Sequence, residues 1–194
     1  MTRLLRLPLL GLLFGLAACG INTIPTKEEA AKAKWADVEN QYQRRADLVP
    51  NLVATVKGFA AQEQEVLTAV TEARARASSV QLSADDLSNP ARVAAFQAAQ
   101  DQLGQSLGRL LVTVERYPEL KSNQNFLELQ SQLEGTENRI AIARRDYNEA
   151  ARAYNTEIRT FPSRITAEVI YRSQPLAYFE ATAPNAQTAP AVSF

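Results

Sequence analysis

Arg45 is a basic residue at a position where the surrounding pattern repeats hydrophobic side chains. A guanidinium on the apolar face of a helix can bind an anion in a groove, or it can pair with a carboxylate of another helix. The candidate carboxylate partners are Glu115, Glu134 and Glu137. We favour the ion pair, which would set the register of the helices, because buried charges in proteins are mostly paired. The anion site stays an alternative.

Glu134 and Glu137 could also do chemistry of their own, since residues three apart share one face of a helix. Two carboxylates can hold Mg²⁺ or Ca²⁺, and two acids facing each other across a cleft of about 5–10 Å can cleave a glycan. The chain has no histidine and one cysteine. This composition excludes from the chain itself a Ser-His-Asp triad, a Cys-His pair, a His-ligated zinc or haem, and the Glu-x-x-His motif of di-iron bundles. We therefore expect no metal, no cofactor and no catalytic residue.

Cys19, the one cysteine, ends an apolar leader that carries Arg3 and Arg6 near its start. The apolar stretch 7–19 has 13 residues, whereas a helix needs about 20 to cross a bilayer, so the leader is typical of a signal peptide. Its last four residues, Leu-Ala-Ala-Cys, resemble the bacterial lipobox. That resemblance implies a diacylglycerol on the Cys19 sulfur and cleavage between Ala18 and Cys19. The alternative is an ordinary signal peptide with a chance cysteine.

The leader indicates where the protein is located, and the charge balance limits the kinds of partner that it can bind. An extracytoplasmic protein anchored to the membrane through Cys19 is expected, on the periplasmic face. Resemblance to the sorting signals of lipoproteins in bacteria with two membranes implies that an aspartate after the cysteine would favour retention in the inner membrane, so Gly20 favours the outer membrane if the host has one. Without Arg3 and Arg6 the mature chain has 19 basic and 21 acidic residues, a net charge near −2, so no nucleic-acid partner is expected.

The remaining chain shows the 3–4 spacing of apolar residues that is typical of amphipathic helices. Three long helices are predicted, over residues 26–78, from about 90 to 117, and from about 123 to 161. Pro50 interrupts the first, and either a kink or a reversal would accommodate it. The apolar repeat runs through Pro50 without a slip, which favours the kink. Thr26, Ser88 or Asn89, and Ser122 or Asn123 are the candidate helix starts.

These elements predict an all-α fold, an antiparallel bundle of three to four long helices with coiled-coil-like packing. The predicted organisation is a signal peptide over 1–18, a lipidated tether over 19–25, a helical bundle over 26–162 and a C-terminal segment over 163–194. Within that last segment, residues 163–181 would form a short helix or an extended cover for the bundle. The Ala/Pro/Thr-rich end would be disordered.

Three segments of the sequence resemble the corresponding segments of LemA family proteins. They are QYQRRADLVPNLVATVKGFA (41–60), LLVTVERYPELKSNQNFLELQSQLEGTENRIAIARRDYNEAARAYNTEIRTFP (110–162) and PLAYFEA (175–181). The resemblance covers most of residues 34–181 and implies a membrane-anchored antiparallel helical bundle whose molecular function is generally unassigned. It supplies no catalytic residues. Many family members begin with a membrane-spanning helix, so the lipobox in this chain departs from the common pattern.

The function expected from these observations is a lipid-anchored, non-catalytic protein of the cell envelope. Its bundle would serve as an interaction or scaffold module for a protein partner in the envelope. One alternative is a sensor of a small ligand or anion, with Arg45 lining its pocket. Another is an envelope enzyme that uses carboxylates, for which Glu134 and Glu137 are the candidates.

Overall fold

The structure of the chain is a computed structural model that describes residues 21–180. The helices in chain order are α2 (Thr23–Phe59), α3 (Gln64–Ser79), the 3₁₀-helix η1 (Ala84–Ser88), α4 (Pro90–Val114), α5 (Pro118–Lys121), α6 (Gln124–Glu157), α7 (Ser163–Thr166) and the π-helix η2 (Ala167–Tyr171). Residues 21–180 contain no strand. The all-α prediction is therefore confirmed for the part described. The leader with Ala18 and Cys19 and the tail 181–194 lie outside the described residues.

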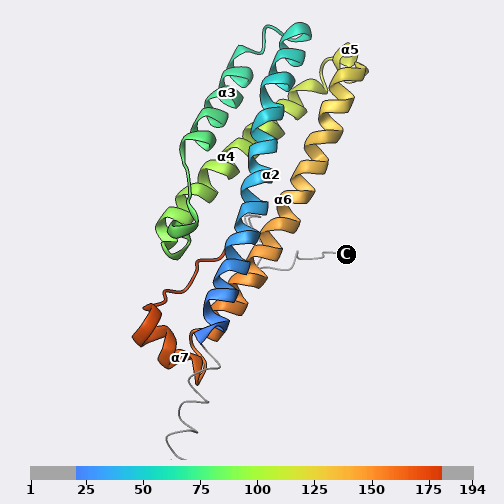
Figure 1. Cartoon of the computed structure of the whole chain (residues 1–194). Helices are drawn as coiled ribbons and strands as arrows, with labels where there is room; N and C mark the ends of the chain where they lie inside the picture. Colours follow the sequence, from blue (N-terminus) through green and yellow to red (C-terminus); the bar gives the residue numbers. More distant parts are fainter. Residues whose placement is uncertain (1–20, 181–194) are drawn as a thin grey trace, which may run out of the picture.

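Two antiparallel helix pairs build the molecule (Figure 1). The long helices α2 and α6 lie side by side along its length, and α3 and α4 form a second pair beside one half of α2. The core divides accordingly into two clusters. One surrounds Trp35 and Tyr147 near the start of α2, and the other surrounds Leu52 and Leu107 near its end. The coiled-coil-like character of the packing stays a prediction.

Helix α2 continues through Pro50, so the chain does not reverse there. It ends at Phe59, however, and residues 60–63 turn the chain back into α3. The expected single helix over 26–78 is therefore wrong in its extent. Glu63 in this turn accepts hydrogen bonds from the Tyr117 hydroxyl at 2.6 Å and from Arg116 Nη2 at 3.0 Å. These contacts with the far end of α4 stabilise a turn that the apolar repeat does not signal.

The helix ends follow local chemistry in part. Asn89 caps α4, accepting from the backbone N–H groups of Ala91 and Arg92, and Asn123 caps α6, accepting from that of Phe126. Both belong to the predicted starts, and a side-chain oxygen at this position satisfies N–H groups that the first turn leaves open. Helix α2 begins at Thr23 rather than at Thr26. Helices α4 and α6 end at Val114 and Glu157, a few residues before the prolines expected to stop them.

The C-terminal part forms both a short helix and an extended cover. We name residues 158–173, which include α7 and η2, the hook, and residues 174–180 the strap. The strap lies against the bundle, where Leu176 and Phe179 are buried. The Phe179 ring stacks on that of Trp35 with centroids 5.9 Å apart. Ile165, Val169 and Ile170 lie in the segment 163–181 that was expected to form a short helix or to cover the bundle, but their side chains are exposed.

Side-chain amides hold the strap in place of a neighbouring strand. The Asn155 amide donates to the Leu176 carbonyl oxygen and accepts from the Leu176 N–H, both at 2.8 Å. Asn148 makes the same pair of bonds with Phe179, both at 2.9 Å. Gln97 of α4 does so with Glu180 at 3.0 and 3.3 Å. An extended segment without a partner strand must satisfy its backbone groups elsewhere. These three amides do so for Leu176, Phe179 and Glu180, while the N–H of Ala177 donates to the Leu87 carbonyl oxygen and its carbonyl oxygen accepts from the Tyr147 hydroxyl.

Candidate functional site

Arg45 lies inside the bundle, on α2, with 3% of its surface exposed. Its Nη1 donates to the Glu137 carboxylate of α6, at 3.1 Å to Oε1 and 3.3 Å to Oε2. Its Nη2 donates to Gln100 of α4, at 2.9 Å to the backbone oxygen and 2.7 Å to Oε1. The guanidinium thus connects three helices. Of the three predicted carboxylates, the structure selects Glu137.

The surroundings of Arg45 hold the guanidinium in one place. Its Cζ lies 5.0 Å from the centre of the Tyr42 ring, a cation–π distance. Gly104 of α4 faces the guanidinium, and a Cβ built there would stand 3.8 Å from Nη1, an ordinary van der Waals distance. Gln100 in turn donates from Nε2 to the Ala77 carbonyl oxygen of α3 at 3.2 Å. The buried Nε of Arg45 has no hydrogen-bond partner among the described atoms.

A hollow of about 480 Å³ opens beside this group, between α4 and α6. Its charged lining consists of Arg45, Arg144, Asp101 and Glu137, two positive and two negative side chains. Burial raises the pKa of the Asp101 carboxyl, while the positive charges of Arg144 and Arg45 act in the opposite direction. Arg45 is already paired with Glu137, and Arg144 donates from Nη2 to the Glu180 carbonyl oxygen at 2.6 Å and lies over the Phe179 ring. An anion in the hollow would therefore compete with existing partners of both guanidinium groups.

The other two carboxylates lie elsewhere on the surface. Glu115 is exposed near the end of α4 and pairs with Lys121. Glu134 is exposed on α6 and accepts a hydrogen bond from Gln130 at 2.9 Å. Neither reaches Arg45, so the predicted set of four residues reduces to one pair. Within residues 21–180 no group of three or more acidic, histidine or cysteine side chains stands close enough to hold a metal ion.

The role of Gln100 in this site was not predicted from the sequence. It occupies an apolar position of the helical repeat in α4, as Arg45 does in α2, and both are buried. Two polar residues on the inner faces of two helices signal a buried hydrogen bond between them, because each needs a partner. That signal was present in the sequence.

Comparison with known families supplies the assignment. Residues 34–194 match the LemA family. The chain belongs to the LemA family. The match confirms the resemblance of the sequence segments to this family. The matched region includes Arg45, Gln100 and Glu137.

Individual relatives carry two kinds of name. Magnetosome protein MamQ 2 of Paramagnetospirillum magneticum is 30% identical over 157 residues, which are 73% of this chain and 58% of that protein. Magnetosome protein MamQ of Magnetospirillum gryphiswaldense is 27% identical with the same coverage. Protein LemA of Metamycoplasma hominis is 26% identical over 126 residues, 65% of this chain and 53% of that one. The chain thus spans little more than half the length of these relatives.

None of the helices in residues 21–180 combines the length and the apolar character that crossing a bilayer requires.

Proposed function

We propose that this LemA-family chain is a lipid-anchored, non-catalytic protein of the cell envelope whose helical bundle binds a protein partner. The observation that carries the proposal is the position of Cys19, the one cysteine, at the end of a lipobox-like leader and four residues before α2 begins at Thr23. A lipid on that sulfur would hold the start of α2 directly at the membrane. Residues 1–18 would then be the signal peptide, and the tether expected over 19–25 would be shortened to 19–22 because α2 begins at Thr23.

The length of α2 supports a role in presenting a surface away from the bilayer. Its 37 residues correspond to about 55 Å at the rise of an α-helix. The α3–α4 pair packs along the half of α2 that lies away from the proposed anchor (Figure 1). Such a bundle would carry an exposed surface well clear of the headgroups, on the periplasmic face and at the outer membrane if the host has one.

The buried polar group supports a structural role for Arg45 rather than a catalytic or sensing one. Its guanidinium donates to Glu137 and Gln100 from both terminal nitrogens. An anionic ligand would have to displace a carboxylate already in place. A register-setting pair is consistent with the polar contacts that position helices in other bundles.

The anchor is tested by replacing the attachment atom. Cells grown with a labelled fatty acid should incorporate the label into the natural protein, and Cys19→Ala should abolish incorporation and leave the larger precursor. A matched control is Ser122→Ala, far from the leader, which should label normally. Equal labelling of Cys19→Ala and the natural protein contradicts the proposal.

The partner is tested separately, by cross-linking in intact cells followed by recovery from membranes. A protein captured reproducibly through cross-linkers on exposed positions of α3 or α4, and not from cells that carry the Cys19→Ala chain, supports the interaction role. Failure to recover a reproducible protein across growth conditions counts against it.

A further inference from the structure

From Phe161 to Tyr171 the hook exposes its large apolar side chains and buries small ones, whereas Ile158 at its start belongs to the core. Phe161 is 72% and Val169 73% exposed, and Ile165 and Ile170 are exposed as well. By contrast, Ser163, Thr166 and Ala167 of the same segment are buried against the bundle. A surface segment in water normally shows the opposite arrangement, and a cluster of large exposed apolar residues marks a surface that contacts something apolar.

The hook also lies at the end of the bundle where the chain leads to Cys19. The Tyr171 hydroxyl donates to the Ile21 carbonyl oxygen at 2.8 Å, and Ile21 is two residues after Cys19 in the sequence. Two residues of chain reach at most about 7 Å. Figure 1 shows α7 beside the start of α2, away from the α3–α4 end. A bilayer that holds a lipid on Cys19 would therefore meet the hook.

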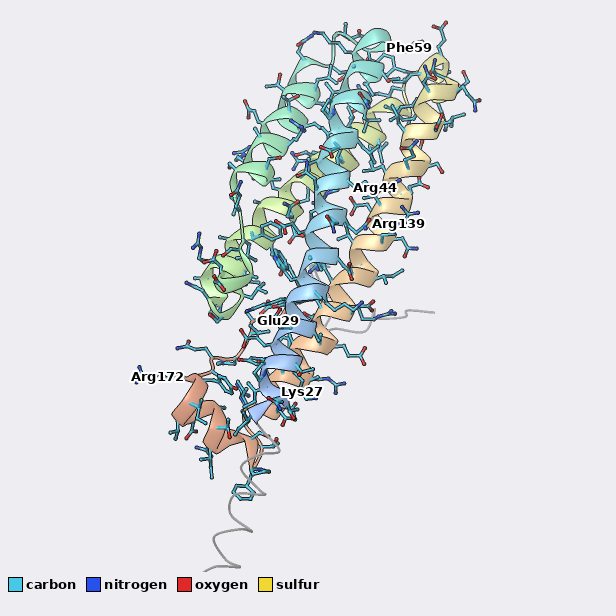
Figure 2. The ribbon with its side chains drawn as sticks, viewed as in Figure 1. Lys27, Glu29, Arg44, Phe59, Arg139 and Arg172 are labelled. Carbon is cyan, nitrogen blue, oxygen red and sulfur yellow. The ribbon has the colours of Figure 1, made fainter. Side chains whose placement is uncertain are left out.

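The charge of the hook suits an anionic lipid surface. Residues 158–173 contain three arginines, Arg159, Arg164 and Arg172, and one acid, Glu168, a net charge of +2 in a chain that is neutral overall. Arg159 and Arg172 are exposed, and Figure 2 places Arg172 and Lys27 at this end of the bundle. Apolar side chains flanked by arginines are typical of segments that lie in the headgroup region, where long basic side chains reach the phosphates.

We propose that the hook is a second membrane contact, which inserts Phe161, Ile165, Val169 and Ile170 into the interface of an anionic phospholipid bilayer. The inference rests on the proposed lipid anchor for the position of the bilayer. A lipid anchor alone leaves the bundle free to tilt relative to the bilayer. A lipid anchor together with a hook inserted in the same membrane surface would fix the orientation of the bundle. The partner surface would then be presented at a constant angle.

The test uses the complete mature chain with Cys19→Ser, so that no lipid contributes. Its binding to vesicles of phosphatidylglycerol and phosphatidylethanolamine is measured by co-sedimentation, alone and with the paired substitutions Val169→Asp and Ile170→Asp. Val112→Asp is the matched control, because Val112 is also 73% exposed but lies on α4, outside the hook. Circular dichroism establishes that each variant is folded.

The hook variant should bind these vesicles at least about tenfold more weakly, Val112→Asp should bind as the unsubstituted chain does, and vesicles of phosphatidylcholine alone should bind less. Equal binding of the hook variant and its parent, or no binding by the parent, would overturn the proposal. A different result would overturn it as well: the parent does not bind vesicles but is a dimer in analytical ultracentrifugation, and the hook substitutions abolish that dimer. The apolar surface of the hook would then contact a second copy of the chain rather than a bilayer. If the parent chain binds vesicles but Cys19 of the natural protein proves to carry no lipid, the proposed anchor is wrong and the proposed membrane contact of the hook is retained.

Discussion

Arg74 of α3 donates from Nε to the carbonyl oxygen of Ala46 in α2 at 2.8 Å. In an uninterrupted helix that oxygen would accept from the N–H of residue 50, but residue 50 is proline and has none. The side chain of a neighbouring helix therefore replaces the missing backbone donor. This contact explains how a proline stands inside α2 with the buried Ala46 carbonyl still satisfied, and it ties α3 to α2 at that level.

The first prediction concerns this replacement. Arg74→Met should cost about 1–2 kcal/mol of unfolding free energy, because it leaves a buried carbonyl without a donor. In a Pro50→Ala background the helix supplies its own N–H, so the same substitution should cost about 1 kcal/mol less. Urea unfolding of the four chains in this double-mutant cycle measures the difference. An equal cost of Arg74→Met in both backgrounds would show that the side chain does not replace the proline's missing donor.

The two partners of the buried ion pair should respond unequally to removal. Glu137→Ala leaves the buried Arg45 charge without its carboxylate and should cost about 1–3 kcal/mol, a range reduced because the Glu137 side chain is 45% exposed and partly screened by water. Arg45→Met removes the buried charge and leaves Glu137 in contact with water. It also leaves Gln100 Oε1 without its donor, but an unpaired neutral acceptor costs less than an unpaired buried charge, so this substitution should cost less than Glu137→Ala. Denaturant midpoints decide the order.

Glu134→Ala is the control for this pair, since Glu134 is exposed on the same helix and does not reach Arg45. It should change stability by less than about 0.5 kcal/mol. If Arg45→Met proves the more destabilising of the two, the contacts with Gln100 outweigh the ion pair, and the role assigned to Glu137 is wrong.

Tyr147 should make the protein less stable in alkali. Burial raises the pKa of its hydroxyl above the ordinary value of 10.0, and that hydroxyl donates to the Ala177 carbonyl oxygen of the strap. As the pH rises past 10, the unfolded chain releases this proton while the folded chain retains it, so folding stability is lost with rising pH. Tyr147→Phe should flatten the fall in urea midpoint between pH 9 and 11, although it lowers stability at neutral pH. A slope identical to the parent's in that range contradicts the assignment.

Asn155 should be the residue on which the strap most depends. Asn155→Ala leaves the N–H and the carbonyl oxygen of buried Leu176 unpaired and should cost about 2–3 kcal/mol. Release of the strap would also expose Trp35, the chain's one tryptophan, which stacks on Phe179. Its fluorescence should therefore shift to the red, and the Leu176 amide should exchange faster with solvent.

Gln43→Ala provides the comparison for the strap, because the Gln43 amide donates to exposed Asp47 on its own helix and, within residues 21–180, makes no hydrogen bond to the strap. Neither its fluorescence nor its amide exchange at Leu176 should differ from the parent's. Unchanged fluorescence and exchange in Asn155→Ala would show that the amide does not hold the strap.

The sequence by itself determined the features that depend on near neighbours. The apolar repeat predicted which faces of α2, α4 and α6 are buried, because a helix places residues three and four apart on one side. The caps at Asn89 and Asn123 were also predictable, since a cap acts on N–H groups two or three residues away. Short sequence segments were enough to indicate the LemA family.

Contacts between distant residues were decided only in the tertiary structure. The repeat continues in phase from Val56 to Val66, so it could not distinguish a straight helix from one that turns back at residues 60–63, where Glu63 meets Tyr117. It could not choose among Glu115, Glu134 and Glu137, because Glu134 and Glu137 share a helix and only the rotation of α6 against α2 brings one of them to Arg45. Nor could it show that the hook turns its apolar side chains outward. Each outcome depends on which surfaces, distant in the sequence, pack together. A periodic pattern of apolar residues does not specify which surface packs against which.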